Sequence, residues 1–326
     1  MSKLHENELV ERSISIGRHR ESDLIEALAK IHASHPFVAD AEVVPFGGSN
    51  LLVSTDSFSE QEDFLGGLDP EAMGRVMTYG AIADILACGV KPEFLVQAWN
   101  IDERHDEAFY VRVAQGVQQV ASRYGAKIVG GDIGVAKEWY WTATVFASCA
   151  SPVRRVASRR VDFDLYATGP LGMANVAVFL KRPLPEPALR APVPSSALFA
   201  TDTSGGLFDA LENFRRANPD SWLEVDADRA VALEIVRDLP KGVESGWALV
   251  GGVGEYELVF AVPCGERVEG ALKIGTGGFG SGREGEIVIA SGGKSGRMVS
   301  SPPDYRAIVP EDWLGVTAAY WASLGL

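Results

Sequence analysis

Three aspartates follow apolar runs and stand where a carboxylate could meet a phosphate or a metal ion. Asp56 ends LLVSTD, Asp132 follows KIVGG and Asp202 ends LFATD. Strand ends are where open sheets present side chains to ligands, because the loops there border a crevice. Aspartate is also a preferred residue of turns and helix caps, so for any one of the three a structural role is the commoner outcome.

Asp84 is harder to explain as a turn or cap residue. It lies in DPEAMGRVMTYGAIADILACGVKP, where Pro70 and Gly89 mark the expected ends of a helix. Asp84 follows Gly80 by four positions and precedes Cys88 by four, so it shares an otherwise apolar or small face. A carboxylate turned toward a core needs a cation beside it, which leaves a structural ion pair and a metal ligand as equal alternatives.

Two glycines directly precede Asp132 in KIVGGDIG. Gly130 and Gly131 allow backbone angles and close approaches that a side chain forbids, so we predict that a tight, bare turn delivers Asp132. Such a turn is either only a turn or a place where backbone and carboxylate meet a phosphate or a metal ion. Magnesium bound with a nucleotide takes a few carboxylates from separate loops, so a cluster of Asp56, Asp84 and Asp132 would suit it.

Helices and strands alternate along the chain and would position these residues. Helical spacing with proline or glycine near the ends predicts helices, and short β-branched or aromatic runs predict strands. The expected helices cover 21–35, 70–89, 106–125 and 206–217, with another after a glycine turn within 165–183, and the expected strands cover 50–56, 93–99, 126–132, 138–150, 197–202, 256–263, 271–275 and 286–290. This mixture favours an α+β or α/β architecture. With 326 residues the chain suits two domains, which we place at 1–152 and 153–326.

One glycine motif resembles a dinucleotide-binding fingerprint but is not interpreted as one. GTGGFGSG has the GxGxxG spacing at Gly275, Gly277 and Gly280. A dinucleotide-binding fingerprint must open a helix, whereas the strand-like EIVIA follows here, so we predict a flexible hairpin loop instead.

Composition excludes several partners. The net charge of -14, from 44 acidic and 30 basic residues, argues against nucleic acid or an anionic membrane as the main partner. No apolar run has the length of a membrane span, and the charged amino terminus does not resemble a signal peptide. The three cysteines, Cys88, Cys149 and Cys264, lack disulfide or zinc spacing, so we predict reduced core residues of a cytoplasmic protein. No GxSxG elbow occurs, and the five histidines lie in polar surroundings that predict exposure, so a nucleophilic hydrolase is unsupported.

Six segments, in order, resemble the AIR synthase-like superfamily, and thiamine-monophosphate kinase most in layout. VSTDSFSEQEDF is similar to the kinase's STDTLVEGVHF, IADILACGVKP to LSDLAAMGAxP, and GGDIG to GGDTT. Further along, YATGPLGMANVAVFL resembles VTGxLGxSAAGL, TDTSGGLFDAL resembles DISDGLxxDL, and GGVGEYELVFAVP resembles GGEDYELLFTVP. The resemblance extends from about residue 22 to about residue 290.

The resemblance implies two α+β domains, a homodimer joined through sheets of the amino-terminal domains, and ATP with magnesium in the cleft between domains. It also implies a small-molecule substrate. The residues it implies are the metal ligands Asp56, Asp84 and Asp132, the cofactor-binding residues Thr55, Gly130, Gly131 and Asp132, and the catalytic residues Asp132 and Asp202.

The sequence departs from the family pattern at four places. FGGSN at 46–50 stands for GDDAA, so the paired aspartates are absent from that segment. Ala81 replaces the asparagine of NLSD, Gly205 replaces the second aspartate of DISDG, and Glu255 is the nearest carboxylate where the family has GGED. Fewer carboxylates predict fewer or weaker metal sites, and this counts against thiamine monophosphate as the substrate.

Two classes of function therefore compete. The first is an ATP- and magnesium-dependent enzyme that phosphorylates a small molecule or activates a carbonyl oxygen by phosphorylation. The second is a non-catalytic nucleotide- or ligand-binding homodimer that keeps the fold. The arginines at 154, 155, 159 and 160 either steady phosphate charge or form a solvated linker, and the linker is favoured. The loop at 181–195 and the segment NPDSWLEVD either line a pocket or cover the surface.

Overall fold

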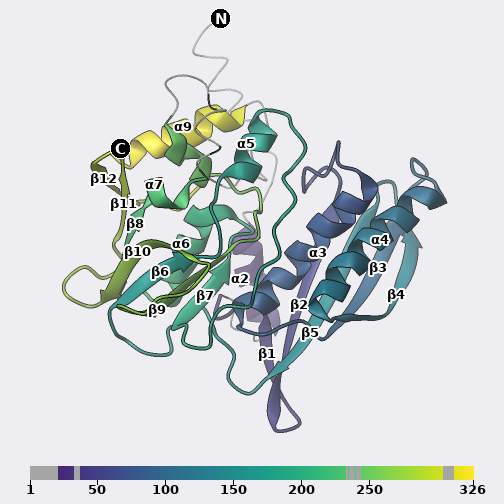
Figure 1. The fold of residues 1–326 in the computed structure, drawn as a ribbon, viewed down its shortest axis with the longest axis horizontal. Coiled ribbons are helices and arrows are strands. Elements are labelled where there is room, and N and C mark those ends of the chain that lie inside the picture. The colour runs from purple at the N-terminus through teal and green to yellow at the C-terminus, as the bar shows by residue number, and fades with distance from the viewer. Residues whose placement is uncertain (1–20, 33–36, 233, 235–238, 240–243, 304–311) are drawn as a thin grey trace, which may run out of the picture.

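The computed structural model describes residues 21–32, 37–232, 234, 239, 244–303 and 312–326. Two sheets with helices packed on them give an α+β architecture, which confirms the predicted fold class (Figure 1). Among the described residues, no helix combines the length and the apolar character that crossing a membrane requires.

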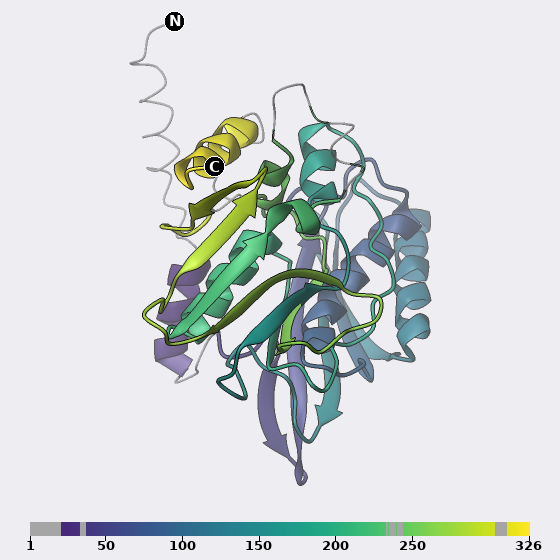
Figure 2. The same ribbon diagram turned by 60° about the vertical axis from the view of Figure 1, so that its left-hand side comes forward.

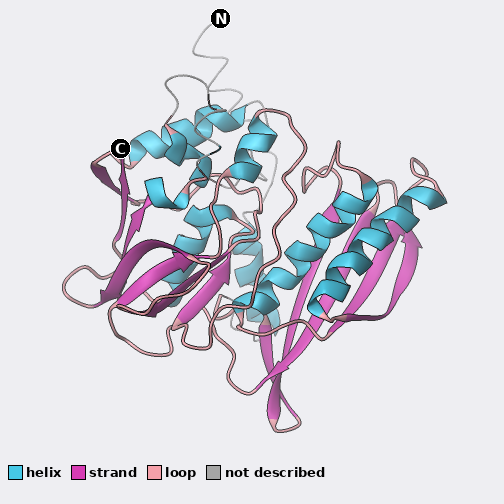
Figure 3. Ribbon diagram, viewed as in Figure 1, coloured by secondary structure: helices cyan, strands magenta, loops and turns pink. Residues whose placement is uncertain are grey.

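The first sheet has five strands in the order β1-β2-β5-β3-β4. The helices α3 (Pro70–Ala87) and α4 (Glu107–Tyr124) lie together on one face of it (Figure 3). The opposite face, called here the open face, carries exposed apolar side chains that include Val44, Phe94 and Val96. The strands are β1 (Glu42–Phe46), β2 (Ser49–Ser59), β3 (Phe94–Ile101), β4 (Lys127–Val135) and β5 (Tyr140–Cys149).

The turn predicted at Gly130 and Gly131 is wrong, because β4 continues through both glycines. The pairing of β4 with β3 shifts register at this point, and Gly130 has a φ of 151°. A bulge of this kind is a usual position for glycine within a strand. At Gly131 an added Cβ would lie 2.0 Å from the carbonyl oxygen of Gln97, so the strand pairing itself requires glycine there.

The helix α3, which carries Asp84, is buried on nearly every side. It approaches α4 so closely that an added Cβ at Gly74 or Gly116 would lie 2.0 Å from the carbonyl oxygen of Val113 or Glu71, respectively. It also packs against β2 and β5 of the first sheet and against β7 and β9 of the second. A helix that is apolar all round belongs in an interior, so a charged residue on it needs a specific partner.

The second sheet has seven strands in the order β12-β11-β8-β10-β6-β9-β7. The glycine-rich residues 275–278 lie inside β10, so the predicted hairpin loop is wrong there. A Cβ at Gly277 would lie 2.3 Å from the ring of Phe163, which explains why a strand carries glycine at this position. The strands are β6 (Phe163–Ala167), β7 (Phe199–Asp202), β8 (Ser221–Asp226), β9 (Leu258–Pro263), β10 (Leu272–Phe279), β11 (Ile287–Ser291) and β12 (Lys294–Arg297). The segment SWLEVD, whose role the sequence left open, is β8.

Helices cover one face of the second sheet, and α3 packs against the other. The covering elements include α5 (Met173–Phe179), α6 (Gly206–Ala217), α7 (Ala227–Ala230), the 3₁₀ helix η1 (Ser245–Leu249) and α9 (Trp313–Ser323). The helix α2 (Glu21–His32) lies at the edge of the molecule, on the side of the second sheet (Figure 2). Because α3 contacts both sheets, it helps to join the two halves of the chain.

The proline-rich loop at 181–195 runs alongside α3 and reaches the end of α4 (Figure 1). Leu184 and Val193 of this loop are buried in the core of the first half. The Tyr124 hydroxyl donates to the carbonyl oxygen of Arg190 at 2.9 Å and accepts from its backbone N–H at 3.0 Å. The loop therefore ties the second half of the chain to the helices of the first.

Candidate functional site

Three aspartates from distant parts of the chain meet beside α3. Asp84 lies on α3, Asp40 precedes β1, and Asp202 ends β7. Each offers a carboxylate oxygen, and these atoms all lie within 4.8 Å of one another. The side chain of Asp40 is 1% exposed and Asp202 is 5% exposed. We call Asp40, Asp84 and Asp202 the aspartate cluster; it lies where the two halves of the chain meet.

One guanidinium group accompanies the aspartate cluster. Arg155 forms an ion pair with Asp40, and its Nε donates to the Thr201 hydroxyl at 3.1 Å. The charges of Asp84 and Asp202 also act on Arg155. Three ionised carboxylates against one guanidinium leave a surplus of negative charge that suits a divalent cation.

Arg155 differs from the rest of the basic segment in which it lies. The arginines at 154, 159 and 160 are exposed, as a solvated linker predicts. Arg155 is only 15% exposed in its side chain and points into the aspartate cluster. The linker prediction is therefore wrong for this one residue, because burial alternates along the extended segment.

Burial raises the pKa of every carboxyl group in the cluster. The pKa of Asp84 lies well above its ordinary value because of burial and then because of the charges of Asp56 and Asp40. The Ser54 hydroxyl donates to Asp84 and opposes the shift. The pKa of Asp202 is likewise well above its ordinary value, and that of Asp40 is raised by burial although Arg155 lowers it. Carboxyl groups that are this reluctant to ionise lack counter-charge, which is common at functional sites.

The donor set fits a hard divalent cation. The Oδ2 atom of Asp40 is buried and has no hydrogen-bond partner, an arrangement that is costly unless a ligand satisfies the atom. Magnesium is usually held by one or two carboxylates, several waters and substrate phosphates. Asp40, Asp84 and Asp202 are thus the residues that could hold Mg²⁺ in this chain.

FGGSN, the segment that stands for the family's GDDAA, contributes no carboxylate to the aspartate cluster. Residues 46–50 hold the turn between β1 and β2, where Gly47 and Gly48 have φ angles of 59° and 84°. Asp40, in the segment VADAE, instead supplies a carboxylate close to those of Asp84 and Asp202. Sequence reasoning missed Asp40, for which an aspartate just before the first strand was the one available signal. It named Arg155 only among four arginines, for which a solvated linker was favoured.

Asp56 borders the aspartate cluster, whereas Thr55 faces away from it. Alternation along β2 turns Ser54, Asp56 and Phe58 toward α3. The charge of Asp56 contributes to the raised pKa of Asp84. The Thr55 hydroxyl instead forms a 3.0 Å hydrogen bond with the Thr144 hydroxyl on the open face.

Asp132 also lies on the open face of the first sheet. It is paired with Ala98, which is paired with Thr142 and through it with Ser57, so all four side chains point the same way. Asp132 is exposed and is not among the carboxylates that meet at Asp84. Within one chain, the predicted trio of Asp56, Asp84 and Asp132 is therefore not assembled.

The segment GGVGEYELVF brings Glu255 and Tyr256 to the borders of the site. A Cβ added at Gly80 of α3 would lie 2.9 Å from the ring of Tyr256, so this loop rests directly on the helix that carries Asp84. Glu255 accepts hydrogen bonds from the backbone N–H groups of Gly172 and Ala174 at 2.6 and 2.8 Å, and it caps α5. Burial raises the pKa of Glu255 to about 7.

One histidine departs from the predicted exposure. The His105 ring stacks on Phe109 with the ring centres 4.0 Å apart, and its Nδ1 lies 2.9 Å from Asp102 Oδ1. Its side chain is 20% exposed, because the start of α4 folds back over the end of β3. His5, His19 and His35 lie outside the described residues.

The cysteine prediction holds in part. Cys88, Cys149 and Cys264 are all free thiols. Cys88 is buried beneath the aspartate cluster, where burial raises its pKa to about 12. Cys264 is exposed in the turn after β9, so it is not a core residue.

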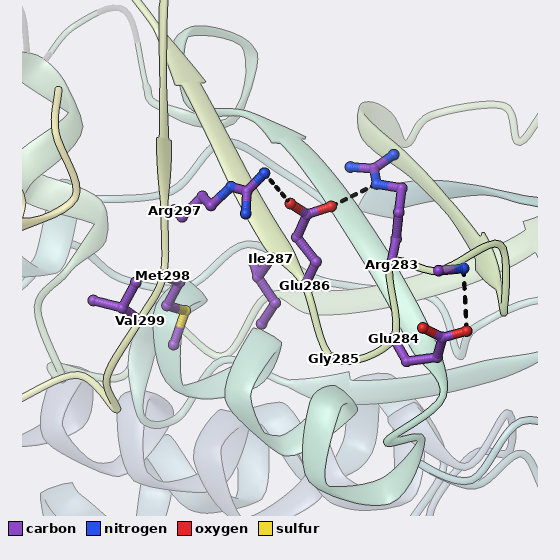
Figure 4. A pocket seen from close by; sticks show the side chains of 9 residues that line it. Arg283, Glu284, Gly285, Glu286, Ile287, Arg297, Met298 and Val299 are labelled. Carbon is purple, nitrogen blue, oxygen red and sulfur yellow. Dashed lines mark hydrogen bonds and ion pairs between the residues drawn. The ribbon is translucent and has the colours of Figure 1, made fainter.

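A separate cavity of 510 Å³ lies beside β11 and β12 (Figure 4). Glu286 bridges Arg283 at 2.5 Å and Arg297 at 2.8 Å, and Arg283 also stacks over the Trp222 ring. These charged groups are paired with one another across the cavity. Surplus charge is therefore a feature of the aspartate cluster rather than of this cavity.

Comparison with known proteins identifies the first half of the chain. Residues 38–149 match the family described as AIR synthase related protein, N-terminal domain. Beyond this matched region, the chain as a whole is similar to thiamine-monophosphate kinases. The matched region begins just before Asp40 and contains Asp84.

Two thiamine-monophosphate kinases show how much of the chain the likeness covers. The kinase of Pyrococcus horikoshii is 27% identical over 259 residues, which are 75% of this chain and 82% of the relative. The kinase of Mycobacterium tuberculosis is 28% identical over 267 residues, which are 72% of this chain and 78% of the relative. The likeness thus extends beyond the N-terminal domain into the second half.

Solved structures share the fold of this chain. The thiamine monophosphate kinase of Aquifex aeolicus has a TM-score of 0.71 at 20% identity, covering 83% of this chain and 98% of that one. AaThiL complexed with AMPPCP and TMP has a TM-score of 0.72 at 19% identity, covering 86% and 97%. Hydrogenase maturation protein HypE in complex with ATP has a TM-score of 0.60 at 19% identity, covering 90% and 98%.

Proposed function

We propose that this protein is an ATP- and magnesium-dependent phosphotransferase that acts on a small molecule, in the manner of a thiamine-monophosphate kinase. The aspartate cluster is the observation that carries the proposal, since it brings three carboxylates within 4.8 Å of one another and, within the described part of the chain, only Asp40 among them is paired with a guanidinium. The relatives named as thiamine-monophosphate kinases and the fold shared with AaThiL complexed with AMPPCP and TMP support the reaction class.

In this proposal Asp40, Asp84 and Asp202 hold Mg²⁺. When bound, the ion would neutralise charge on the phosphates of ATP, and catalysis of phosphoryl transfer depends mainly on such positioning and charge neutralisation. Asp56 borders the ion site from β2, and Ser54 orients Asp84 through its hydrogen bond. Asp202 ends β7 in the second half, so it would lie nearest to an acceptor bound there.

The missing aspartate at Gly205 has a substitute within α6. A Cβ at Gly205 would lie 2.5 Å from an Asp209 carboxylate oxygen, so that carboxylate occupies the space which a larger residue at position 205 would fill. The charge of Asp209 also acts on Arg155. The loss at Gly205 therefore weighs less against catalysis than the sequence alone predicts.

We further propose a cytoplasmic homodimer with domain boundaries near residues 152 and 153. The apolar open face would pack against the same face of a second chain, since Val44, Phe94 and Val96 are 45%, 42% and 37% exposed. Thr55, Gly130, Gly131 and Asp132 belong to the strands of this face or its edge. Asp132 and its glycines would then serve the nucleotide only through the partner chain. Sedimentation of Val96→Asp as a monomer would support this arrangement.

Calorimetry with AMPPCP tests the nucleotide and metal proposal. We expect binding to the wild type that requires Mg²⁺ and is lost in Asp84→Asn, while the exposed Asp162→Asn keeps it. Release of ADP from ATP with thiamine monophosphate as acceptor then tests the substrate. Mg²⁺-dependent binding without any ADP release would favour the alternative, a non-catalytic nucleotide-binding homodimer. Absence of nucleotide binding in the wild type would overturn the ATP-dependent proposal and leave a non-catalytic homodimer that binds another ligand.

A further inference from the structure

We propose that Thr201 and Arg155 are positioning residues that orient Asp40 for metal binding, an inference that rests on the proposed Mg²⁺ site. Both residues engage the same oxygen of Asp40. The Thr201 hydroxyl donates to Oδ1 at 2.7 Å, and the Arg155 guanidinium forms its ion pair with that atom as well. The two donors thereby leave Oδ2 as the buried oxygen that has no hydrogen bond.

The donors are themselves held in place. Arg155 Nε donates to the Thr201 hydroxyl at 3.1 Å, so the hydroxyl accepts from one neighbour and donates to the other. The backbone N–H of Arg155 donates to the carbonyl oxygen of Val38 at 2.9 Å, and Asn218 donates to the carbonyl oxygen of Arg155 at 2.8 Å. Thr201 lies in β7 and has no exposed surface. Asp40 is therefore clamped by groups that have little freedom to move.

The clamp spans the two halves of the chain. Asp40 lies just before β1 of the first sheet, whereas Thr201 belongs to the second sheet, and Arg155 lies in the segment between them. A carboxylate whose terminal torsion is unrestrained rotates broadly, and it would present either oxygen to a metal ion. Hydrogen bonds that fix the orientation of a ligating group typically affect metal affinity by about 10- to 100-fold.

Two charge-preserving substitutions separate orientation from electrostatics. Thr201→Val removes the hydroxyl with little change in shape, and Arg155→Lys keeps the positive charge but loses the planar fork. If Arg155 acted only through its charge, lysine would leave metal affinity unchanged and valine at position 201 would have no effect. The clamp instead predicts weaker binding in both variants.

The test is a titration of the full chain with Mn²⁺ alone, followed by the electron paramagnetic resonance signal of the free ion. We expect Thr201→Val and Arg155→Lys each to weaken Mn²⁺ binding by about 10-fold or more. Thr201→Ser restores a hydroxyl and should remain within about 3-fold of the wild type. Thermal unfolding without metal verifies that each variant is folded. If Arg155→Lys does not fold, the comparison of Thr201→Val with Thr201→Ser alone tests whether the hydroxyl orients Asp40.

The outcomes distinguish this inference from the metal site on which it rests. Wild-type binding that Asp84→Asn abolishes but Thr201→Val leaves unchanged would overturn the clamp and keep the site. Equal weakening in Thr201→Val and Thr201→Ser would also overturn it, because the hydroxyl would not be the cause. No Mn²⁺ binding by the wild type would remove the proposed metal site, and the clamp with it.

Discussion

Buried aspartates in two regions of this protein have pKa values that are shifted in opposite directions. In the aspartate cluster, Asp84 and Asp202 have pKa values well above the ordinary range, because burial and neighbouring carboxylates both disfavour their charge. At the end of β3, the side chain of Asp102 is also 0% exposed, although it lies closer to the surface of the molecule than Asp84 and Asp202 do. Its pKa nevertheless lies at about 2.

Shallower burial and the donors around the carboxylate together account for the difference. Burial alone would raise the pKa of Asp102, but hydrogen bonds from His105, Arg104 and Tyr110 outweigh it. These donors lie 2.9, 2.7 and 3.1 Å away, so this carboxylate is fully satisfied by its own chain. The aspartate cluster has three carboxylates and few donors. A satisfied buried charge indicates a structural role, and an unsatisfied one indicates a ligand site.

The largest expected effect contrasts Asp102→Ala with Asp84→Asn in the absence of metal. Asp102→Ala removes the acceptor shared by three donors, so the free energy of unfolding should fall by about 3 kcal/mol. Asp84→Asn removes a poorly compensated buried charge, so stability should be unchanged or rise by about 1 kcal/mol. Urea unfolding in the presence of a chelator measures both. Losses of the same size in the two variants would show that the regions do not differ in this way.

A slightly smaller effect is expected from adding metal. Mg²⁺ at about 100 times its dissociation constant should raise the free energy of unfolding of the wild type by about 2.7 kcal/mol, since it binds only the folded cluster. The increase should vanish in Asp84→Asn. Glu103→Gln, a change at an exposed acidic residue, should retain it. An equal increase in Asp84→Asn would place the stabilising ion elsewhere in the molecule.

Sequence patterns predicted the helices around the aspartate cluster better than they predicted which residues form it. The bounds of α3 and α4 follow from local signals, namely Pro70 at the start of one and Gly125 in a left-handed conformation at the end of the other. Helical spacing likewise indicated that Asp84 would face an interior and need a counter-charge. These features depend on residues a few positions apart, which is the range that periodicity reports.

The rest of the cluster depends on contacts between distant segments. Asp40 and Arg155 are separated by more than a hundred positions, and nothing local distinguishes Arg155 from the exposed Arg154 next to it. The glycines before Asp132 have the composition of a turn, yet β-pairing with β3 holds them in a strand. Strand pairing also decides that Asp132 faces away from Asp84, and register is a tertiary property that the apolar pattern alone does not fix.

Glu255 is intermediate between Asp102 and the aspartate cluster. Its carboxylate accepts two backbone N–H bonds, from Gly172 and Ala174, and burial raises its pKa from 4.5 to about 7. A folded-state pKa above the unfolded value means that the group's contribution to stability is complete below about pH 4.5 and is lost as the pH rises through about 7. Glu255 thus lacks the compensation that Asp102 has, but it carries no surplus of neighbouring carboxylates like that at Asp84.

Glu255→Gln should remove this pH dependence, because glutamine stays neutral and its carbonyl oxygen can still accept one of the two bonds. As the pH rises from 5 to 8, the wild type should lose about 2 kcal/mol of unfolding free energy that the variant keeps. This is somewhat less than the full pKa shift of Glu255 implies, because its side chain keeps some contact with solvent. Urea unfolding at both pH values, with a chelator present and Glu269→Gln as an exposed control, measures the difference. Parallel pH profiles for wild type and Glu255→Gln would mean that the two backbone donors satisfy this carboxylate as fully as the side-chain donors satisfy Asp102. Charge would then be unsatisfied only where several carboxylates meet, and burial by itself would not mark a ligand site in this protein.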